Sequence, residues 1–193
     1  MKVITIDREF GAGGHSVGRA VAARLGLEIY DKDIIAEAAR ESGIASEEMA
    51  KEEERLSSGA SFINHIIPVS YDVKDVVFEA ESKVILDLAA KGPCIILGRC
   101  GNAILQDAGV EALDVFLYAE REARVKRAGE LLGLEDEDDI LTAIKKKDKE
   151  RRGYYEYYTD HVWGACEEYD LCLNTGYFSF EQCVDMICAA AQA

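Results

Sequence analysis

Three glycines within four residues, Gly11, Gly13 and Gly14, follow a short β-branched run and precede a helical pattern. Glycine has no Cβ, so its backbone N–H can face a ligand and its φ can be positive. A strand that leads through such a loop into a helix brings bare N–H groups and the positive end of a helix dipole to one point. This arrangement predicts a phosphate-binding loop. Its residues are Gly11, Ala12, Gly13, Gly14, His15 and Ser16.

The loop departs from the full P-loop pattern GxxxxGK[ST], in which the lysine binds phosphate and the Ser/Thr hydroxyl binds magnesium. If Ser16 is that hydroxyl, His15 takes the place of the lysine, and residues 3–31 contain no lysine at all. The nearest cations are Arg8 before the loop and Arg19 one turn inside the helix. We expect one of these two arginines to supply the missing charge, and we count Arg19 with the binding residues. A tight turn without a ligand is the alternative.

A basic segment lies late in a chain whose formal net charge is −15. Six of the eight residues at 145–152 are Lys or Arg, and four of the nine tyrosines follow at 154–158. Arg151 and Arg152 are the candidates for binding phosphate, because a guanidinium can donate two parallel hydrogen bonds to phosphate oxygens. The alternative is a solvated helix face that the acidic run at 135–139 neutralises. One or two of the tyrosines could stack on a base or donate to phosphate.

Five short apolar runs are the candidate strands that must position these groups, and helical patterns separate them. They lie at residues 3–6, 27–30, 94–97, 113–118 and 169–173. Strands that alternate with helices predict an α/β fold, in which helices cover both faces of a parallel sheet. Ligands bind such sheets at the carboxyl ends of the strands. The glycine loop and Arg99 both follow strand ends, so topology and chemistry predict the same site.

Two connections are long for crossovers between parallel strands, which usually need far fewer residues. About sixty residues separate the second and third strands, and about fifty separate the fourth and fifth. Helical segments on both sides of a phosphate site predict flaps that close over the ligand and exclude water. An apolar cluster in the first connection consists of Phe62, Ile63, Ile66 and Ile67. We expect another element or a second subunit to cover this cluster, so a homodimer is one expectation.

Length and composition fit one soluble globular domain. The chain has 193 residues, of which 49% are hydrophobic and 31% charged, and its pI is about 4.6. This acidity argues against general binding to nucleic acid or to anionic membranes, and no apolar run approaches the ~20 residues of a membrane span. Asp7 interrupts the N-terminal apolar run, so we expect no signal peptide and a cytoplasmic protein. The six cysteines include no CxxC pair, and we expect reduced thiols without structural disulfides.

Four segments, in order along nearly the whole chain, resemble the cytidylate kinase-like family, a branch of the P-loop nucleoside monophosphate kinases. They are ITIDREFGAGGHSVGRAVAARLGLEIYDKDII, ILGRCGNAIL, DVFLYAEREARVKR and KKKDKERRGYYEYY. The resemblance implies a three-layer P-loop fold with a five-stranded parallel sheet in the order 2-3-1-4-5, within one domain at residues 1–193. It also implies an acceptor flap at about 31–92 and a lid at about 134–165.

The resemblance further implies an ATP-dependent phosphotransferase that acts on a nucleoside monophosphate or another small phosphoryl acceptor. Its cofactors would be ATP and Mg²⁺, with Ser16 on the metal. Arg99 would hold the acceptor phosphate, while Arg151 and Arg152 would arrive with the lid and stabilise charge on the transferred group. Asp148 also matches the lid segment of the family and is counted with the catalytic residues.

Two positions depart from true cytidylate kinases. Their loop reads GAGKG[ST], and alignment of the GAG places Gly14 at the lysine. Alignment of Asp31 places Glu37 where their second-strand segment has an arginine that grips the monophosphate. These departures leave two alternatives open: a phosphate- or nucleotide-binding protein without kinase activity, and a kinase of another small molecule. For His15, an ordinary residue at a helix start is the alternative to a phosphate contact.

Overall fold

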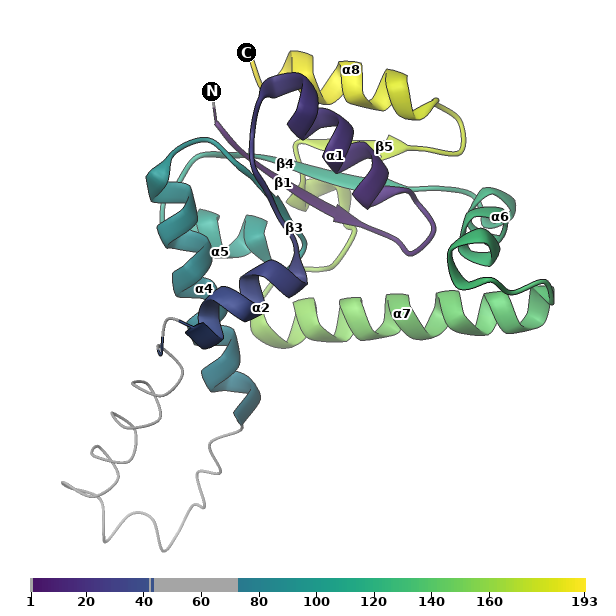
Figure 1. Cartoon of the computed structure of the whole chain (residues 1–193), viewed down its shortest axis with the longest axis horizontal. Helices are drawn as coiled ribbons and strands as arrows, with labels where there is room; N and C mark the ends of the chain where they lie inside the picture. Colours follow the sequence, from purple (N-terminus) through teal and green to yellow (C-terminus); the bar gives the residue numbers. More distant parts are fainter. Residues whose placement is uncertain (1, 42, 44–72) are drawn as a thin grey trace, which may run out of the picture.

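Five strands form one parallel sheet in the part of the chain that the computed structural model describes, residues 2–41, 43 and 73–193 (Figure 1). They are β1 (Val3–Arg8), β2 (Ile29–Tyr30), β3 (Ile95–Leu97), β4 (Ala112–Tyr118) and β5 (Leu171–Asn174). Their order is β2-β3-β1-β4-β5, and every pairing is parallel. The predicted α/β class and strand order are confirmed.

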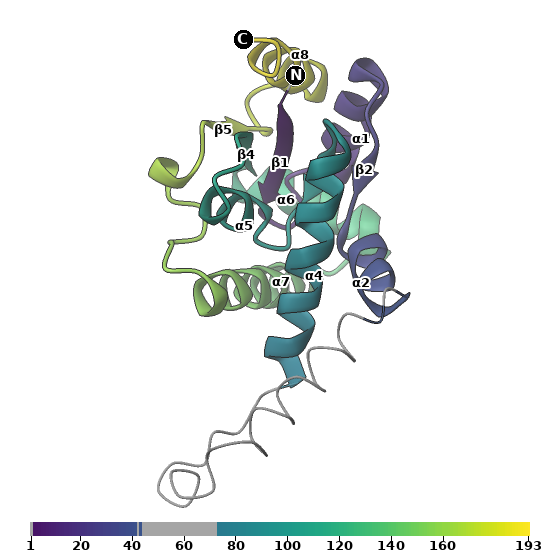
Figure 2. The same cartoon turned by 90° about the vertical axis from the view of Figure 1, so that its left-hand side faces the viewer.

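One face of the sheet is covered by the first and last helices of the chain, α1 (Gly14–Leu25) and α8 (Phe180–Ala190) (Figures 1 and 2). Their apolar side chains share a core with Ile4 and Ile6 of β1. Because α1 follows the glycine loop directly, this packing fixes the loop at the carboxyl edge of the sheet.

The opposite face is covered by helices from the two long connections and by one helix between β3 and β4. They are α2 (Lys32–Glu41), α4 (Val73–Lys91), α5 (Gly101–Asp107) and the C-terminal half of α7 (Glu137–Tyr158). A further helix, α6 (Arg121–Leu132), packs against the first part of α7 beyond the carboxyl ends of the strands (Figure 1). A 3₁₀ turn at Cys166–Glu168 precedes β5.

The central strand, β1, ends with two charged residues, Asp7 and Arg8, that the sequence analysis placed beyond the strand. Successive side chains of a strand point to opposite faces. Arg8 therefore shares the face of Ile6 and lies against the start of α1. Asp7 points to the other face, where the hydroxyl of Tyr169 donates to it at 3.4 Å. The strand end thus presents a cation to the loop and a carboxylate to the opposite layer.

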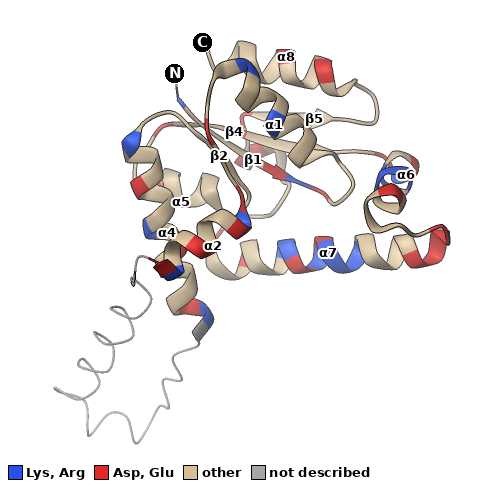
Figure 3. Cartoon of the chain, viewed as in Figure 1, with Lys and Arg blue, Asp and Glu red and all other residues tan. Residues whose placement is uncertain are grey.

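The basic and tyrosine runs lie on α7, a single helix of 22 residues. Asp136 caps this helix by accepting hydrogen bonds from the N–H groups of Asp138 and Asp139, each at 3.0 Å. Acidic side chains in a first turn are favourable because they oppose the helix dipole. Figure 3 shows these acids at the start of α7 and the cations in its middle. The helix that begins within this acidic run continues through Tyr158 and so carries the basic segment.

Local signals around α1 and α2 also match the structure. Gly26 ends α1 with a φ of 67°, in the left-handed region that favours glycine. Asp31 caps α2 by accepting hydrogen bonds from the N–H groups of Asp33 and Ile34, at 3.1 and 3.2 Å. The second strand is shorter than predicted. The N–H of Leu27 donates to the carbonyl of Ala22 at 2.9 Å, so Leu27 belongs to the end of α1.

Three further expectations concern the first long connection, the cysteines and membrane-spanning segments. The helix expected from Ser46 and the apolar cluster Phe62, Ile63, Ile66 and Ile67 lie outside the described residues. All six cysteines are free thiols, and four of them are buried. None of the described helices is long and apolar enough to cross a membrane.

Candidate functional site

The glycine loop joins β1 to α1. Gly11 and Gly13 have φ values of 83° and 81°, in the left-handed region that favours glycine. Gly13 is the N-cap of α1, and no side chain among the described residues caps this helix start. The N–H groups of the first turn therefore remain available to an anion, which the helix dipole favours.

Close neighbours explain why the loop needs glycine at positions 13 and 14. A Cβ on Gly13 would collide with the ring of Phe180 from α8. A Cβ on Gly14 would lie 2.6 Å from Cγ of Arg8, a distance that real Cβ atoms do not show. The loop is thus packed between α8 on one side and the Arg8 side chain on the other.

A cavity of about 330 Å³ lies among the end of β1, the end of β3 and α7; we call it the cation pocket. Its charged lining consists of the cations Arg8, Lys32, Arg99, Lys147 and Arg151 and the carboxylates Asp7 and Glu150. Its aromatic lining consists of Tyr154, Tyr155 and Trp163. An excess of positive charge in a cavity of this size suits a small anionic ligand.

Two arginines meet at the loop side of the cation pocket. Arg151 reaches across from α7 and donates from Nη1 to the backbone carbonyl of Arg8 at 2.9 Å. Burial lowers the pKa of Arg8 to about 10, and the charge of Arg151 adds to this effect. The ion pair of Arg8 with Asp7 is long, 3.9 Å from Nη1 to Oδ1. Nε of Arg8 is buried and has no hydrogen-bond partner among the described residues.

The buried carboxylate of the cation pocket is Asp7, whose residue is 8% exposed. It accepts a hydrogen bond from the N–H of Arg8 at 3.2 Å in addition to the contact with Tyr169. Burial raises the pKa of Asp7, while the charges of Arg8 and Arg151 oppose that rise. Asp7 therefore balances part of the positive charge without neutralising both arginines.

Arg99 follows β3 and has a φ of 57°, which is uncommon for a residue with a side chain and typical of functional sites when it occurs. Its guanidinium pairs with Glu81 of α4, whose side chain is 2% exposed, and lies 4.4 Å from the centroid of the Tyr154 ring. The Tyr154 hydroxyl donates to the same carboxylate at 3.0 Å. Arg99 thus enters the pocket with its charge balanced by Glu81.

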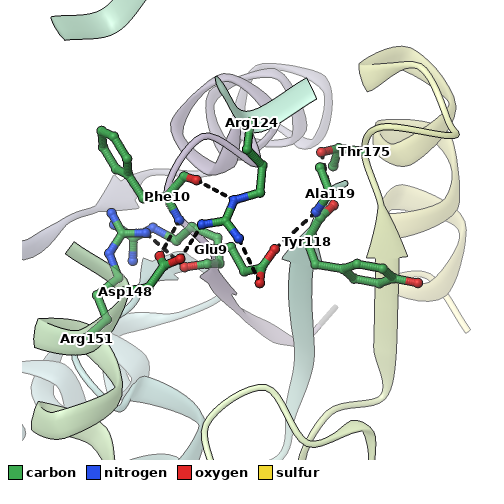
Figure 4. Close-up of polar contacts among 9 residues, drawn as sticks. Glu9, Phe10, Tyr118, Ala119, Arg124, Asp148, Arg151 and Thr175 are labelled. Carbon is green, nitrogen blue, oxygen red and sulfur yellow. Dashed lines mark hydrogen bonds and ion pairs between the residues drawn. The ribbon is translucent and has the colours of Figure 1, made fainter. Parts of the chain in front are cut away.

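Asp148 belongs to a polar network that ties α7 to the start of the loop (Figure 4). It accepts a hydrogen bond from the N–H of Phe10 at 2.7 Å and pairs with Arg124 of α6. Arg124 also pairs with Glu9 at 3.0 Å and donates to the Phe10 carbonyl at 2.9 Å. These contacts hold α7 so that Arg151, three residues further on, reaches the end of β1.

A second cavity, of about 490 Å³, lies on the α6 and α8 side of the loop; we call it the Phe180 pocket. It is lined by Gly13, Ser16, Ala123, Lys126, Arg127, Glu130, Leu131 and Phe180. The Arg127 guanidinium lies 4.5 Å from the centroid of the Phe180 ring and is held by hydrogen bonds to Thr175, at 2.9 and 2.6 Å. An aromatic ring and a fixed guanidinium are surfaces on which a nucleotide base stacks.

The structure brings part of the predicted set together. Arg99 and Arg151 line the cation pocket, and Gly13 and Ser16 line the Phe180 pocket. Arg152 is exposed on α7, with its guanidinium 5.6 Å from the centroid of the Trp163 ring, and it lines neither cavity.

His15 and Arg19 lie on the solvent side of α1. Arg19 is exposed. The side chain of His15 is 52% exposed, and its Nδ1 lies 3.9 Å from a carboxylate oxygen of Asp31. Partial burial and the charge of Arg8 lower the pKa of His15. The pKa of His15 is thus lowered although the carboxylate of Asp31 opposes the change, and the neutral imidazole predominates at pH 7.

Three residues that shape the site were not predicted from the sequence: Arg127 and Phe180, which line the Phe180 pocket, and Glu81, which pairs with Arg99. Arg127 had a visible signal, since it stands one helical turn after Arg124 and close to a predicted strand end. Glu81 and Phe180 had none, because a single glutamate in a long helix and a phenylalanine at a helix start are common.

No group of three or more His, Cys, Asp or Glu side chains that could hold a metal ion occurs in residues 2–41, 43 and 73–193. Magnesium at a phosphate site usually takes only one or two protein ligands and fills its shell with phosphate oxygens and water. The exposed hydroxyl of Ser16, in the first turn of α1, fits that limited role.

Comparison with known proteins agrees with this fold. A model of the cytidylate kinase-like family matches residues 3–177. The structure of an uncharacterized protein from Eubacterium ventriosum is 26% identical, with a TM-score of 0.77 over 100% of this chain and 99% of that chain. Two kinases share the fold at lower identity, each over 100% of this chain and 99% of its own: shikimate kinase from Bacteroides thetaiotaomicron (15%, TM-score 0.52) and APS kinase from Mycobacterium tuberculosis (16%, TM-score 0.51). No curated protein matches the chain.

Proposed function

The chain belongs to the cytidylate kinase-like family, and from this premise we propose that it transfers the γ-phosphoryl group of ATP to a small anionic acceptor. A nucleoside monophosphate is the first candidate, because the segments that resemble the family extend over nearly the whole chain. The cation excess of the cation pocket supports an acceptor that carries a phosphate of its own.

The observation that carries the proposal is the position of the loop between two unlike cavities. The Phe180 pocket offers a ring and a guanidinium to a base, and the start of α1 offers N–H groups to a phosphate chain. The cation pocket lies beyond the other side of the loop. A donor bound across the loop would therefore present its terminal phosphate to an acceptor in the cation pocket.

In the proposed reaction an acceptor oxygen forms a bond to the γ-phosphorus while the bond from that phosphorus to the β–γ bridging oxygen breaks. ADP leaves, and an acceptor that is already an ionised phosphate loses no proton. The transition state spreads negative charge over the transferred oxygens, so positioning and neutralisation of charge dominate catalysis. Mg²⁺, when bound, neutralises charge between the phosphates.

The chain's own groups have separate roles in the proposed reaction. The N–H groups of Gly14 to Ser16 orient the phosphate chain, and the Ser16 hydroxyl contributes an oxygen to the metal. Arg99 orients the acceptor phosphate from the end of β3. Arg151 lies on the transferred group and opposes its charge. Asp148 positions Arg151 through the contacts of α7 with the loop.

A phosphate- or nucleotide-binding protein without kinase activity is the second candidate. The absence of a lysine from the loop favours it, because that lysine normally reaches the β- and γ-phosphates. Binding through backbone N–H groups would survive such a loss, whereas transfer depends on charge at the γ-phosphate.

A coupled phosphoryl-transfer assay with ATP, Mg²⁺ and each nucleoside monophosphate tests the proposal. We expect turnover with one acceptor or a few, and strongly reduced turnover in Arg151→Ala purified in parallel, which controls for contaminating kinases. The panel is then extended to sugar phosphates. ATP binding by calorimetry without transfer to any acceptor would favour the second candidate instead.

A further inference from the structure

The side chain of Arg8 runs along the glycine loop and ends at β3. Its Cγ lies 2.6 Å from the point that a Cβ on Gly14 would occupy, and its Nη1 would collide with a Cβ on Gly98. The side chain therefore spans the space between the first turn of α1 and the end of β3. It is only 11% exposed.

The course of the Arg8 side chain explains why glycine, Gly14, stands at the position that aligns with the P-loop lysine. Gly14 is helical and is not among the residues with positive φ, so its backbone would accept a lysine. The stem of Arg8 is what excludes one. Arg8 and a lysine at position 14 would compete for the same space.

The charge of Arg8 is only partly balanced within the described residues, where the carboxylates of Asp7 and Asp31 oppose the lowering of its pKa by burial. Arg151 contacts its backbone and carries a like charge, and Asp7 lies at the limit of ion-pair distance, 3.9 Å. Nε of Arg8 is buried and lacks a hydrogen-bond acceptor within the described ranges. Nε of Arg99 also lacks an acceptor among the described residues, but the Arg99 guanidinium pairs with the buried carboxylate of Glu81. A buried guanidinium with a free donor is costly unless an anion joins it.

We propose that Arg8 supplies from the strand the positive charge that a lysine supplies from the loop in other P-loop proteins, and that with Arg151 it binds the terminal oxygens of a polyphosphate chain. The ligand class is an inorganic polyphosphate or the triphosphate of a nucleotide. The identification of the donor as ATP rests on the proposed function, but polyphosphate binding at Arg8 can be measured without it.

Titration of the full chain with inorganic tripolyphosphate by calorimetry tests the proposal. Loss of one charge-assisted contact should weaken binding by roughly 10- to 100-fold in Arg8→Met. Arg8→Lys, which keeps the charge, should retain most of the affinity. Arg40→Gln removes an exposed arginine of α2 that lines neither cavity and should bind within about twofold of the unmodified protein.

Moving the positive charge from position 8 to position 14 separates the effect of charge on binding from the effect of packing. Arg8→Ala vacates the space beside Gly14, and Gly14→Lys then returns one positive charge to the loop. We expect the double variant to recover most of the tripolyphosphate affinity that Arg8→Ala alone loses. Thermal melts without ligand establish that each variant is folded before binding is compared.

Three results would overturn the proposal. The first is tripolyphosphate affinity in folded Arg8→Met within twofold of the unmodified protein. The second is a loss confined to Arg19→Gln, which would assign the charge to the helix. The third is a folded double variant without recovery, which would assign the loss to packing. Transfer activity is measured separately, so Arg8-dependent binding without transfer would contradict only the proposed function.

Discussion

The two cavities beside the glycine loop differ in the groups that line them. The cation pocket has five cations against two carboxylates around about 330 Å³. The Phe180 pocket, about 490 Å³, has two cations and one carboxylate, and an aromatic ring with a guanidinium over it. The first suits a whole small anion, and the second suits the base end of a nucleotide. Changes in the cation pocket should therefore alter transfer more than they alter binding of the nucleotide base, and changes in the Phe180 pocket should alter donor affinity more than transfer.

Arg151→Ala should give the largest effect. Arg151 lines the cation pocket and reaches the end of β1, so its loss should lower kcat by on the order of 10³. ATP affinity by calorimetry should fall by less, roughly 10- to 100-fold, because one charge-assisted contact to the terminal phosphate is lost. Arg152→Ala is the matched variant from the next position. Because Arg152 is exposed over Trp163, its loss should lower kcat only severalfold, in line with an exposed cation–π contact.

Equal losses of kcat in Arg151→Ala and Arg152→Ala would contradict this expected difference. They would imply that α7 moves enough to bring Arg152 to the phosphate. A loss of ATP affinity in Arg151→Ala as large as the loss in kcat would place the donor, not the acceptor, in the cation pocket.

Glu81→Gln should destabilise the chain by about 1.5–3 kcal/mol, because it leaves the charge of Arg99 without a carboxylate in a buried place. Denaturant unfolding measures the change. Asp87→Asn, an exposed site on the same helix, should stay within about 0.5 kcal/mol. Unchanged stability in Glu81→Gln, with a changed affinity for the acceptor, would show that Glu81 serves the ligand instead of Arg99.

Phe180→Ala should weaken ATP binding by roughly five- to a hundredfold, the range expected for loss of base stacking. Turnover at saturating ATP should change much less, because Phe180 lines the pocket away from the acceptor. Tyr177→Ala, at a 78% exposed tyrosine nearby in sequence, is the control and should bind ATP normally. A lower kcat with unchanged ATP affinity would reverse the assignment of the two pockets.

The sequence predicted the sheet and the loop because their signals are local. The apolar run of β1 and the glycines after it fix a strand, a turn and a helix without distant information. The carboxyl ends of parallel strands share one edge, so the topology alone placed Arg99 near the loop. The cap at Asp31 was readable for the same reason, since its hydrogen bonds span three residues.

The partners of the site residues could not be predicted in this way. The contacts of Arg99 with Glu81 and of Arg127 with Phe180 join segments far apart in the chain. The sequence offered both Arg8 and Arg19 as substitutes for the lysine, because both lie close to the loop, and we counted only Arg19 with the binding residues. Only the alternation of β1, which turns Arg8 onto Gly14, and the outward direction of Arg19 distinguish them.

His15, in the first turn of α1 and outside the linings of both cavities, should give the smallest effect, visible as a pH dependence. Partial burial is the main reason its pKa is lowered, and the charge of Arg8 is the next; Asp31 opposes them, while Arg19 and Arg151 add to them. A phosphate bound at the loop would counter these positive charges and raise the pKa of His15. Binding would then take up a proton, so the affinity of the protein for tripolyphosphate should gain from acidification.

The gain from His15 should be less than tenfold per pH unit, because one imidazole binds one proton. Tripolyphosphate itself takes up protons near neutral pH, since the second pKa of a phosphate group is about 6, so the relevant quantity is the ratio of affinities between the unmodified protein and His15→Gln. Calorimetry across the pH range near neutrality should show this ratio rising as the pH falls. A ratio that stays constant would mean that His15 is an ordinary residue at the start of α1, and that the phosphate lies on the Arg8 side of the loop, away from the imidazole.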